Sequence, residues 1–205
     1  MKSIIDEWDT VEIPTPPGVD RVELDPGSTA LLVLDIQNQN CNEERRPRCV
    51  RSLPGVVDLL GRARGAGAPV VFSLTSSADR NDIRVEVRPM DGEPVVRSGV
   101  DKFHGTELEE ILLAAGVDTA IITGTSAHGA VLHTATGAAL RGLNVIVPVD
   151  CISSSDPYAE QYTVWHLANG PGSRRRVTLT TSDGIIFVKQ NPRKHNNRQD
   201  YPMHS

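Results

Sequence analysis

The sequence predicts a single α/β domain with three layers, in which helices cover both faces of a mostly parallel sheet of about six strands. Short apolar segments alternate with segments of helical periodicity from residue 29 onward. This alternation is typical of a Rossmann-like sheet with helical crossovers. The length of 205 residues suits one compact domain with a substantial core.

The predicted strands are nearly continuous apolar runs, as expected for strands buried on both faces. The clearest are TALLVLDIQ (29–37), APVVFSL (68–74), DTAIITG (118–124) and NVIVPVD (144–150). A weaker strand is expected within EPVVRSG (93–99), and short strands within VTLTTSDGIIFV (177–188). In sheets of this kind the functional site lies at the carboxyl ends of the strands.

The predicted helices lie between these strands, at residues 56–66, 106–116, 125–141 and 158–170. Glycines mark several of the helix ends, and Thr106 is suited to cap the second helix, whose acidic residues favour the helix dipole. The domain is expected to span residues 29–188. Residues 1–28 are interpreted as an irregular extension and residues 189–205 as a polar tail, either unstructured or draped over a neighbouring chain.

The composition narrows the function classes. The net charge is −5, and no large basic surface suggests binding to nucleic acid or to an anionic membrane. No apolar segment reaches transmembrane length, and the N-terminus lacks the apolar run of a signal peptide. Three cysteines, an odd number, favour reduced thiols over a disulfide framework. We therefore expect a cytoplasmic protein.

Four features at predicted strand ends and turns carry chemistry. Asp35 closes the first strand, Lys102 lies in GVDKFHGTELEEIL, the turn GTSAHGAV links a strand to a helix, and Asp150 ends the next strand. In this order and spacing they resemble the isochorismatase-like hydrolases, or cysteine hydrolase superfamily, over residues 28–188. That superfamily includes nicotinamidases, carbamoylsarcosine amidohydrolases and isochorismatases.

The resemblance implies an Asp–Lys–Cys triad in which Asp35 accepts the proton of the cysteine and Lys102 holds the charge of the acid. It also implies a non-proline cis peptide at Thr125–Ser126. The backbone N–H groups of Ser126 and Ala130 would then face a developing oxyanion. Counted from Gly124, the position of the nucleophilic cysteine is occupied by Ala130.

Three explanations of Ala130 remain open, because a methyl group cannot form an acyl-enzyme. In the first, the alanine is native and Asp35 works by noncovalent acid–base catalysis, as the resemblance implies for isochorismatases, whose turn also carries an Ala-His pair. In the second, the chain is a Cys→Ala variant of an amidohydrolase that cleaves a small amide, carbamate or ureido group. In the third, the chain is a non-catalytic descendant that binds a metabolite or forms a scaffold.

Further residues are candidates for the same site. His128 is expected to orient the substrate, and Gln37, Ser73, Phe103 and Trp165 to contact it. Trp165 belongs to YAEQYTVWHL, where an aromatic cluster is consistent with core packing, a subunit interface or a pocket wall.

No cofactor and no catalytic metal are expected. The region after the second strand lacks the histidines that bind a divalent ion in nicotinamidases. It also lacks a glutamine that contacts substrate in isochorismatases, which counts against isochorismate itself. The expected partner is a small-molecule substrate, and the protein is expected to form a homo-oligomer, a dimer or tetramer, as its relatives do. Cys151 is disfavoured as a replacement nucleophile, because the helix amides that would lower the pKa of its thiol belong to another turn.

Overall fold

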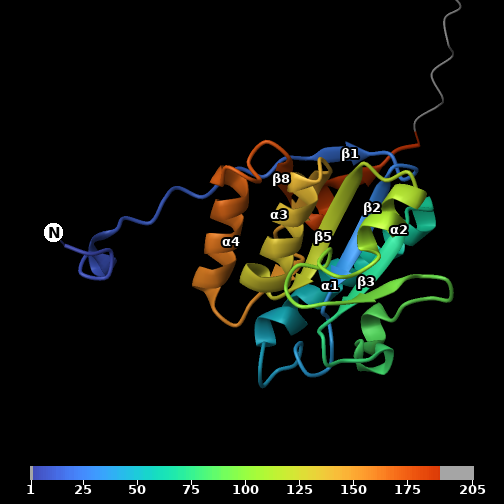
Figure 1. Cartoon of the computed structure of the whole chain (residues 1–205), viewed down its shortest axis with the longest axis horizontal. Helices are drawn as coiled ribbons and strands as arrows, with labels where there is room; N and C mark the ends of the chain where they lie inside the picture. The colour runs from blue at the N-terminus through green and yellow to red at the C-terminus, as the bar shows by residue number, and fades with distance from the viewer. Residues whose placement is uncertain (1, 190–205) are drawn as a thin grey trace, which may run out of the picture.

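The structure is a computed structural model that describes residues 2–189. Its central sheet has the strand order β4-β3-β2-β5-β6-β8, and every pairing is parallel. A short seventh strand pairs with the end of β5. The strands are β2 (Thr29–Leu34), β3 (Val70–Leu74), β4 (Val95–Arg97), β5 (Thr119–Thr125), β6 (Asn144–Pro148), β7 (Ile152–Ser153) and β8 (Val177–Thr180). The predicted mostly parallel α/β fold is confirmed (Figure 1).

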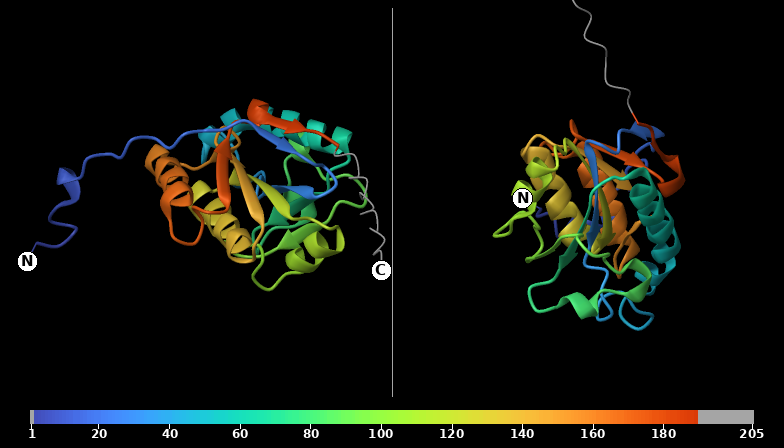
Figure 2. Two further views of the ribbon diagram at one scale, coloured as in Figure 1. Left: turned by 90° about the horizontal axis from the view of Figure 1, so that it is seen from above. Right: turned by 90° about the vertical axis from the view of Figure 1, so that its right-hand side faces the viewer.

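Helices cover both faces of this sheet (Figure 2). One face packs against α1 (Pro47–Ala66), whose apolar residues form a single core cluster with one side of the strands. The opposite face packs against α2 (Leu108–Ala114), α3 (Leu132–Leu140) and α4 (Pro157–Asn169). The 3-10 turns are η1 (Trp8–Thr10), η2 (Arg80–Asp82), η3 (Val85–Val87) and η5 (Ser182–Gly184), and a π-helical turn, η4, spans Ala127–Val131.

Strand β2 shows why the apolar run is continuous. All six of its residues are buried. Because successive side chains of a strand point to opposite faces, Leu31 and Val33 pack with the α1 layer, while Leu32 and Leu34 pack with the other helices. The polar residues that follow this strand therefore emerge from the centre of the sheet, at its carboxyl edge.

Helix α1 begins at Pro47 rather than near residue 56. The sequence places Pro54 and Gly55 inside the helix, and a proline interior to a helix lacks the backbone N–H of a regular hydrogen bond. This pair resembles a helix boundary in the sequence, which explains the late predicted start. The observed first turn brings Arg46, the N-cap residue, to the carboxyl edge of the sheet.

The N-terminal extension is not irregular throughout. Strand β1 (Val22–Leu24) pairs in parallel with β9 (Ile185–Phe187) in a separate two-stranded sheet. The segment before it leads away from the body of the domain (Figure 1) and exposes apolar side chains, including Ile5 and Trp8. The domain boundaries at residues 28 and 188 stay predictions, and residues 190–205 of the predicted tail lie outside the described residues.

The cysteine prediction was wrong. Cys41 and Cys49 form a disulfide, because the start of α1 turns back beside the segment that follows β2 and brings the two Cα atoms to 5.2 Å. Only Cys151 is free, and it is buried. The expected cytoplasmic location was based partly on reduced thiols, and the disulfide removes this support. Within residues 2–189 no helix has the length and apolar character needed to cross a membrane.

Candidate active site

The site is built around Asp35, the first residue after β2. Its φ of 51° lies in the left-handed region, which aspartate tolerates better than most residues and which is often found at functional positions. The backbone turns at this point, and the amide of Gln37 donates to the carbonyl of Asp35 at 2.9 Å. The carboxyl group is held close to the ends of β2 and β3, with Asp35 only 5% exposed.

Lys102 forms an ion pair with Asp35, as the sequence predicts for these two residues. The distance from Lys102 Nζ to Asp35 Oδ2 is 2.8 Å, and the ammonium is fully buried. Its Nζ also donates to three backbone carbonyls, those of Leu74, Ser98 and Gly99, at 3.2, 3.1 and 2.7 Å. Four acceptors thus fix the ammonium in place, as a buried charge requires.

Ser73 completes the immediate surroundings of the carboxyl group. Its Oγ donates to Asp35 Oδ1 at 2.8 Å, so each carboxylate oxygen has one protein partner. Burial raises the pKa of Asp35, and this outweighs the opposite effects of Lys102, Ser73 and the more distant Arg46. At a given pH, the protonated form of Asp35 is therefore more favoured than the protonated form of an exposed aspartate.

The turn after β5 supplies the second half of the site. Gly124 has a φ of 115°, and a Cβ atom there would lie 2.0 Å from the carbonyl oxygen of Leu34 in the neighbouring strand. Only glycine permits this approach of β5 to β2. The peptide between Thr125 and Ser126 is cis, which confirms that prediction. The chain then enters the π-helical turn that carries His128 and Ala130.

Ala130, which the family resemblance places at the nucleophile position, is 3% exposed and packs within the core on the α3 side. Cys151 cannot take over its role. It belongs to the core on the opposite side of the sheet, where its Sγ lies close to Gly55 of α1. Burial raises the pKa of its thiol, with a further contribution from the neighbouring Asp150, so the thiolate is disfavoured.

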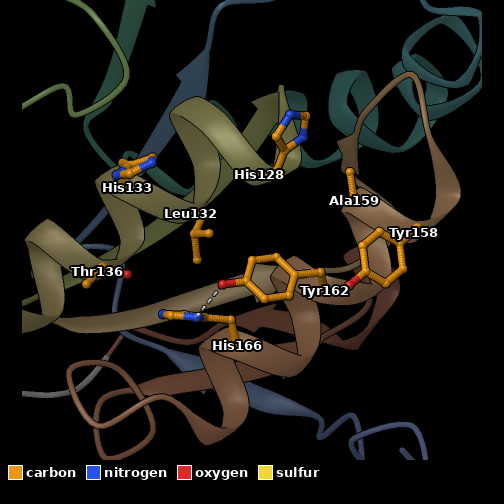
Figure 3. A pocket seen from close by; sticks show the side chains of 8 residues that line it. All are labelled: His128, Leu132, His133, Thr136, Tyr158, Ala159, Tyr162 and His166. Atoms are coloured by element: carbon orange, nitrogen blue, oxygen red, sulfur yellow. Dashed lines mark hydrogen bonds between the residues drawn. The ribbon is translucent and has the colours of Figure 1, made fainter. Parts of the chain in front are cut away.

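His128 lies at the rim of the site rather than inside it. Its side chain is exposed, and its Nδ1 lies 3.0 Å from Ser154 Oγ. It also borders a surface pocket of about 560 Å³ between α3 and α4, which Tyr158, Tyr162 and His166 line from α4 (Figure 3). Asp35 is not among the residues that line this pocket, so the pocket is distinct from the surroundings of the buried carboxyl group.

The four residues that the sequence predicts as substrate contacts lie in different parts of the structure. Gln37 is buried and ties two loops together, since its Oε1 accepts from the backbone amide of Thr75 at 3.0 Å. Phe103 is a core residue under the guanidinium of Arg141, which lies 4.5 Å from the ring centroid. Trp165 is 40% exposed on α4 and does not line the surface pocket. Of the four residues, only Ser73 donates a hydrogen bond to the Asp35 carboxyl group, whereas Gln37 reaches Asp35 through its backbone amide.

The structure adds one residue that the sequence interpretation treated as loop charge. Arg46 donates from Nη1 to Thr125 Oγ1 at 2.8 Å and from Nε to Ser155 Oγ at 3.3 Å. Its signal in the sequence was weak, because it belongs to the cluster Arg45, Arg46 and Arg48 in a polar loop. Within residues 2–189 no group of three or more His, Cys, Asp or Glu side chains is placed to hold a metal ion.

Comparisons with curated proteins point to hydrolases. An N-carbamoylsarcosine amidase of an Arthrobacter species is 34% identical over 162 residues, which cover 65% of this chain and 60% of that protein. A streptothricin hydrolase of Streptomyces noursei is 34% identical over 139 residues, covering 62% of this chain and 55% of the hydrolase. A secreted isochorismatase effector of Verticillium dahliae is 30% identical, covering 64% and 78%. The chain thus spans less than two thirds of the length of the first two relatives.

The solved structures that resemble this chain also include amidases and isochorismatase family proteins. The N-carbamoylsarcosine amidase of Thermoplasma acidophilum superimposes with a TM-score of 0.65 at 26% identity, covering 76% of this chain and 97% of that one. An isochorismatase family protein of Desulfovibrio vulgaris has the same fold, with a TM-score of 0.69 at 20% identity and coverage of 76% and 95%. The isochorismatase domain model matches residues 29–183. The chain therefore belongs to the isochorismatase domain family of hydrolases.

Proposed function

We propose that this protein is a cofactor-free hydrolase of a small metabolite that works by noncovalent acid–base catalysis, with Asp35 as the acid. The observation that carries the proposal is the state of this carboxyl group. It is buried, its pKa is raised, and it lies at the carboxyl edge of a sheet whose next turn carries alanine at the position assigned to the nucleophile. A buried carboxyl group whose pKa is raised is better suited to act as a general acid than an exposed aspartate.

For a vinyl ether the reaction balances without a nucleophile on the protein. The Asp35 carboxyl transfers its proton to the terminal carbon of the double bond, and the ether oxygen supplies electrons to form an oxocarbenium ion. Water adds to that ion and returns a proton to the Asp35 carboxylate. The resulting hemiketal separates into a ketone and an alcohol, so one water is consumed and the acid is regenerated.

The neighbouring groups have distinct roles in this proposal. Lys102 stabilises the carboxylate that remains after proton transfer, through its 2.8 Å contact with Oδ2. Ser73 holds the other carboxylate oxygen and so fixes the direction of the acid. The backbone amides of Ser126 and Ala130 would donate hydrogen bonds to an oxygen atom of the substrate, and His128 would orient the part of the substrate that extends to the rim.

A second candidate is an amidohydrolase, favoured by the similarity to an N-carbamoylsarcosine amidase and a streptothricin hydrolase. Cleavage of an amide through an acyl-enzyme needs a cysteine where this chain has Ala130. In that case the same Asp35 would act as the base that accepts the thiol proton, and this chain would be a disarmed form of the enzyme.

The test compares Asp35→Asn with Asp150→Asn on a panel of vinyl ethers, small amides and carbamates. The sequence places Asp150 among the four features of the site, but the structure gives this exposed acid other partners. Its carboxylate oxygens accept from the amide and the hydroxyl of Ser182, so Asp150 serves as the control. We expect Asp35→Asn to lower kcat about 10²- to 10⁴-fold, the range for a lost general acid, and Asp150→Asn to retain activity. Unchanged turnover in Asp35→Asn would rule out the proposal.

A further inference from the structure

The half-buried guanidinium of Arg46 has no role in the reaction described so far. Among residues 2–189 it forms no ion pair with a carboxylate, whereas Arg48, two residues later, is paired with Glu160. Its protein partners are two hydroxyl groups, those of Thr125 and Ser155. A partly desolvated guanidinium with only neutral partners retains a strong preference for an anion.

The location of Arg46 links it to the acid. Thr125, which accepts from Nη1, is the residue on the N-terminal side of the cis peptide, and the charges of Arg46 and Asp35 influence each other. Ser155, which accepts from Nε, follows Ser154, the contact of His128. Arg46 therefore contacts both the end of β5, at the cis peptide, and the segment that contains the hydroxyl partner of His128. Its Nη2 donates no hydrogen bond to the described part of the chain and remains available to a ligand.

We propose that Arg46 binds a carboxylate of the substrate, so that the protein acts on an anionic small molecule. This inference rests on the proposed function for the position of the reacting group. A planar carboxylate fits the fork of a guanidinium, and hydrogen bonds between the two are among the stronger ones in proteins.

The charge balance of the site supports an anionic ligand. Lys102 and Arg46 each contribute one positive charge, and Asp35 contributes at most one negative charge, so the site is cationic in a chain of net charge −5. Glu160 of α4 does not offset this charge, because its carboxylate is already engaged by Arg48 and by the amide of Ser154. A local excess of positive charge attracts an anion and holds it near the acid.

The disulfide between Cys41 and Cys49 restricts the position of Arg46. Arg46 lies inside the loop closed by Cys41 and Cys49, directly before the first residue of α1. A closed loop restricts the backbone conformations that are available at Arg46. Less conformational entropy is therefore lost when a ligand binds to its side chain. We assign the disulfide a positioning role for Arg46.

Binding of an anion at Arg46 would also favour the acid form of Asp35. The positive charge of Arg46 lowers the pKa of Asp35, together with Lys102 and Ser73, against the larger effect of burial. A bound carboxylate neutralises this contribution of Arg46 and so raises the pKa further. An anionic substrate would therefore help to keep its own proton donor protonated.

The experiment uses a matched pair of probes, 2-methoxyacrylate and its neutral methyl ester. Arg46→Gln is expected to raise KM for the anion roughly 10- to 100-fold, the loss of one charge-assisted contact, while KM for the ester changes less than about threefold. Arg45→Gln is the control, since Arg45 is an exposed neighbour in the same loop whose side chain donates to the Gln39 carbonyl and forms no ion pair within residues 2–189. Arg46→Lys should restore part of the preference.

Two further readouts separate this inference from the proposed function. Calorimetric binding of both probes is measured in the Asp35→Asn background, where a preference for the anion that Arg46→Gln abolishes supports the inference even without turnover. With the ester, Arg46→Gln should shift the falling limb of the pH profile to higher pH, which a purely structural role would not do. Equal losses on both probes, or no change on either, would overturn the inference while leaving the role of Asp35 intact.

Discussion

At the scale of single residues, the raised pKa of Asp35 predicts how stability depends on pH. The folded chain holds this proton more tightly than the unfolded chain does, so the group contributes its full stabilisation below the unfolded pKa. As pH rises through the higher folded pKa, that contribution is lost and the free energy of unfolding falls. Asp35→Asn should flatten this part of the profile, measured by urea denaturation between about pH 4 and 8. Parallel profiles for both proteins would contradict the assignment.

The sequence was informative about single residues where chemistry and chain position coincide. Asp35 was identifiable because an acid ends an apolar run, and Lys102 because it occurs in a segment that matches a family motif. In the structure the two side chains form an ion pair at 2.8 Å. Arg46 was not identifiable, because an arginine in a charged loop has no periodicity that reveals which way it points.

At the scale of elements, the turn after β5 depends on the close approach of two strands. Gly124→Ala should destabilise the fold by roughly 4 kcal/mol or more, because its Cβ would lie 2.0 Å from the Leu34 carbonyl oxygen. Gly142→Ala is the matched control. Its φ of 88° is also positive, but nothing lies within 4 Å, so only the conformational cost of about 1–2 kcal/mol is expected. Denaturation midpoints compare the two, and equal losses would argue against steric contact.

The disulfide between Cys41 and Cys49 gives a second prediction for an element. Closing this short loop should stabilise the fold by about 2–3 kcal/mol, so the double variant Cys41→Ser with Cys49→Ser should unfold at a lower denaturant concentration. Alkylation of the unfolded, non-reduced protein should modify one thiol, that of Cys151. Three alkylated cysteines by mass spectrometry would show that the bond does not form.

The elements differ in how well the sequence predicted them. Strands such as β2 and β5 were predicted within a few residues, because burial on both faces produces an uninterrupted apolar run. The start of α1 was missed because Pro54 obscures the helical pattern. The pairing of β1 with β9 was missed because three-residue strands carry little periodicity and their contact joins opposite ends of the chain.

At the scale of the whole molecule, exposed apolar surface points to self-association. Tyr158, Tyr162 and Trp165 are all at least 40% exposed on α4, and the N-terminal segment adds further exposed apolar side chains. Such surface in a chain of this size is typical of an interface. We propose a homo-oligomer that uses the outer face of α4.

Sedimentation velocity tests this proposal. The protein should sediment as a dimer or tetramer, and Tyr162→Glu should shift it toward the monomer, because the charge would have to be buried at the interface. Leu113→Glu is the control, since Leu113 is 78% exposed on α2, away from α4. A monomeric parent protein, or an oligomer that Tyr162→Glu leaves intact, would refute it.

The central claim is that Asp35 catalyses hydrolysis without a covalent nucleophile, and a paired assay of this chain and its Ala130→Cys variant tests it most directly. Both proteins are given vinyl ethers, small amides and carbamates, and the protein mass is recorded during turnover. The account predicts that the alanine form turns over a vinyl ether with unchanged protein mass, and that cysteine adds nothing. Amide turnover by the cysteine form alone, with an acyl adduct on the new thiol, would contradict it and identify a disarmed amidohydrolase.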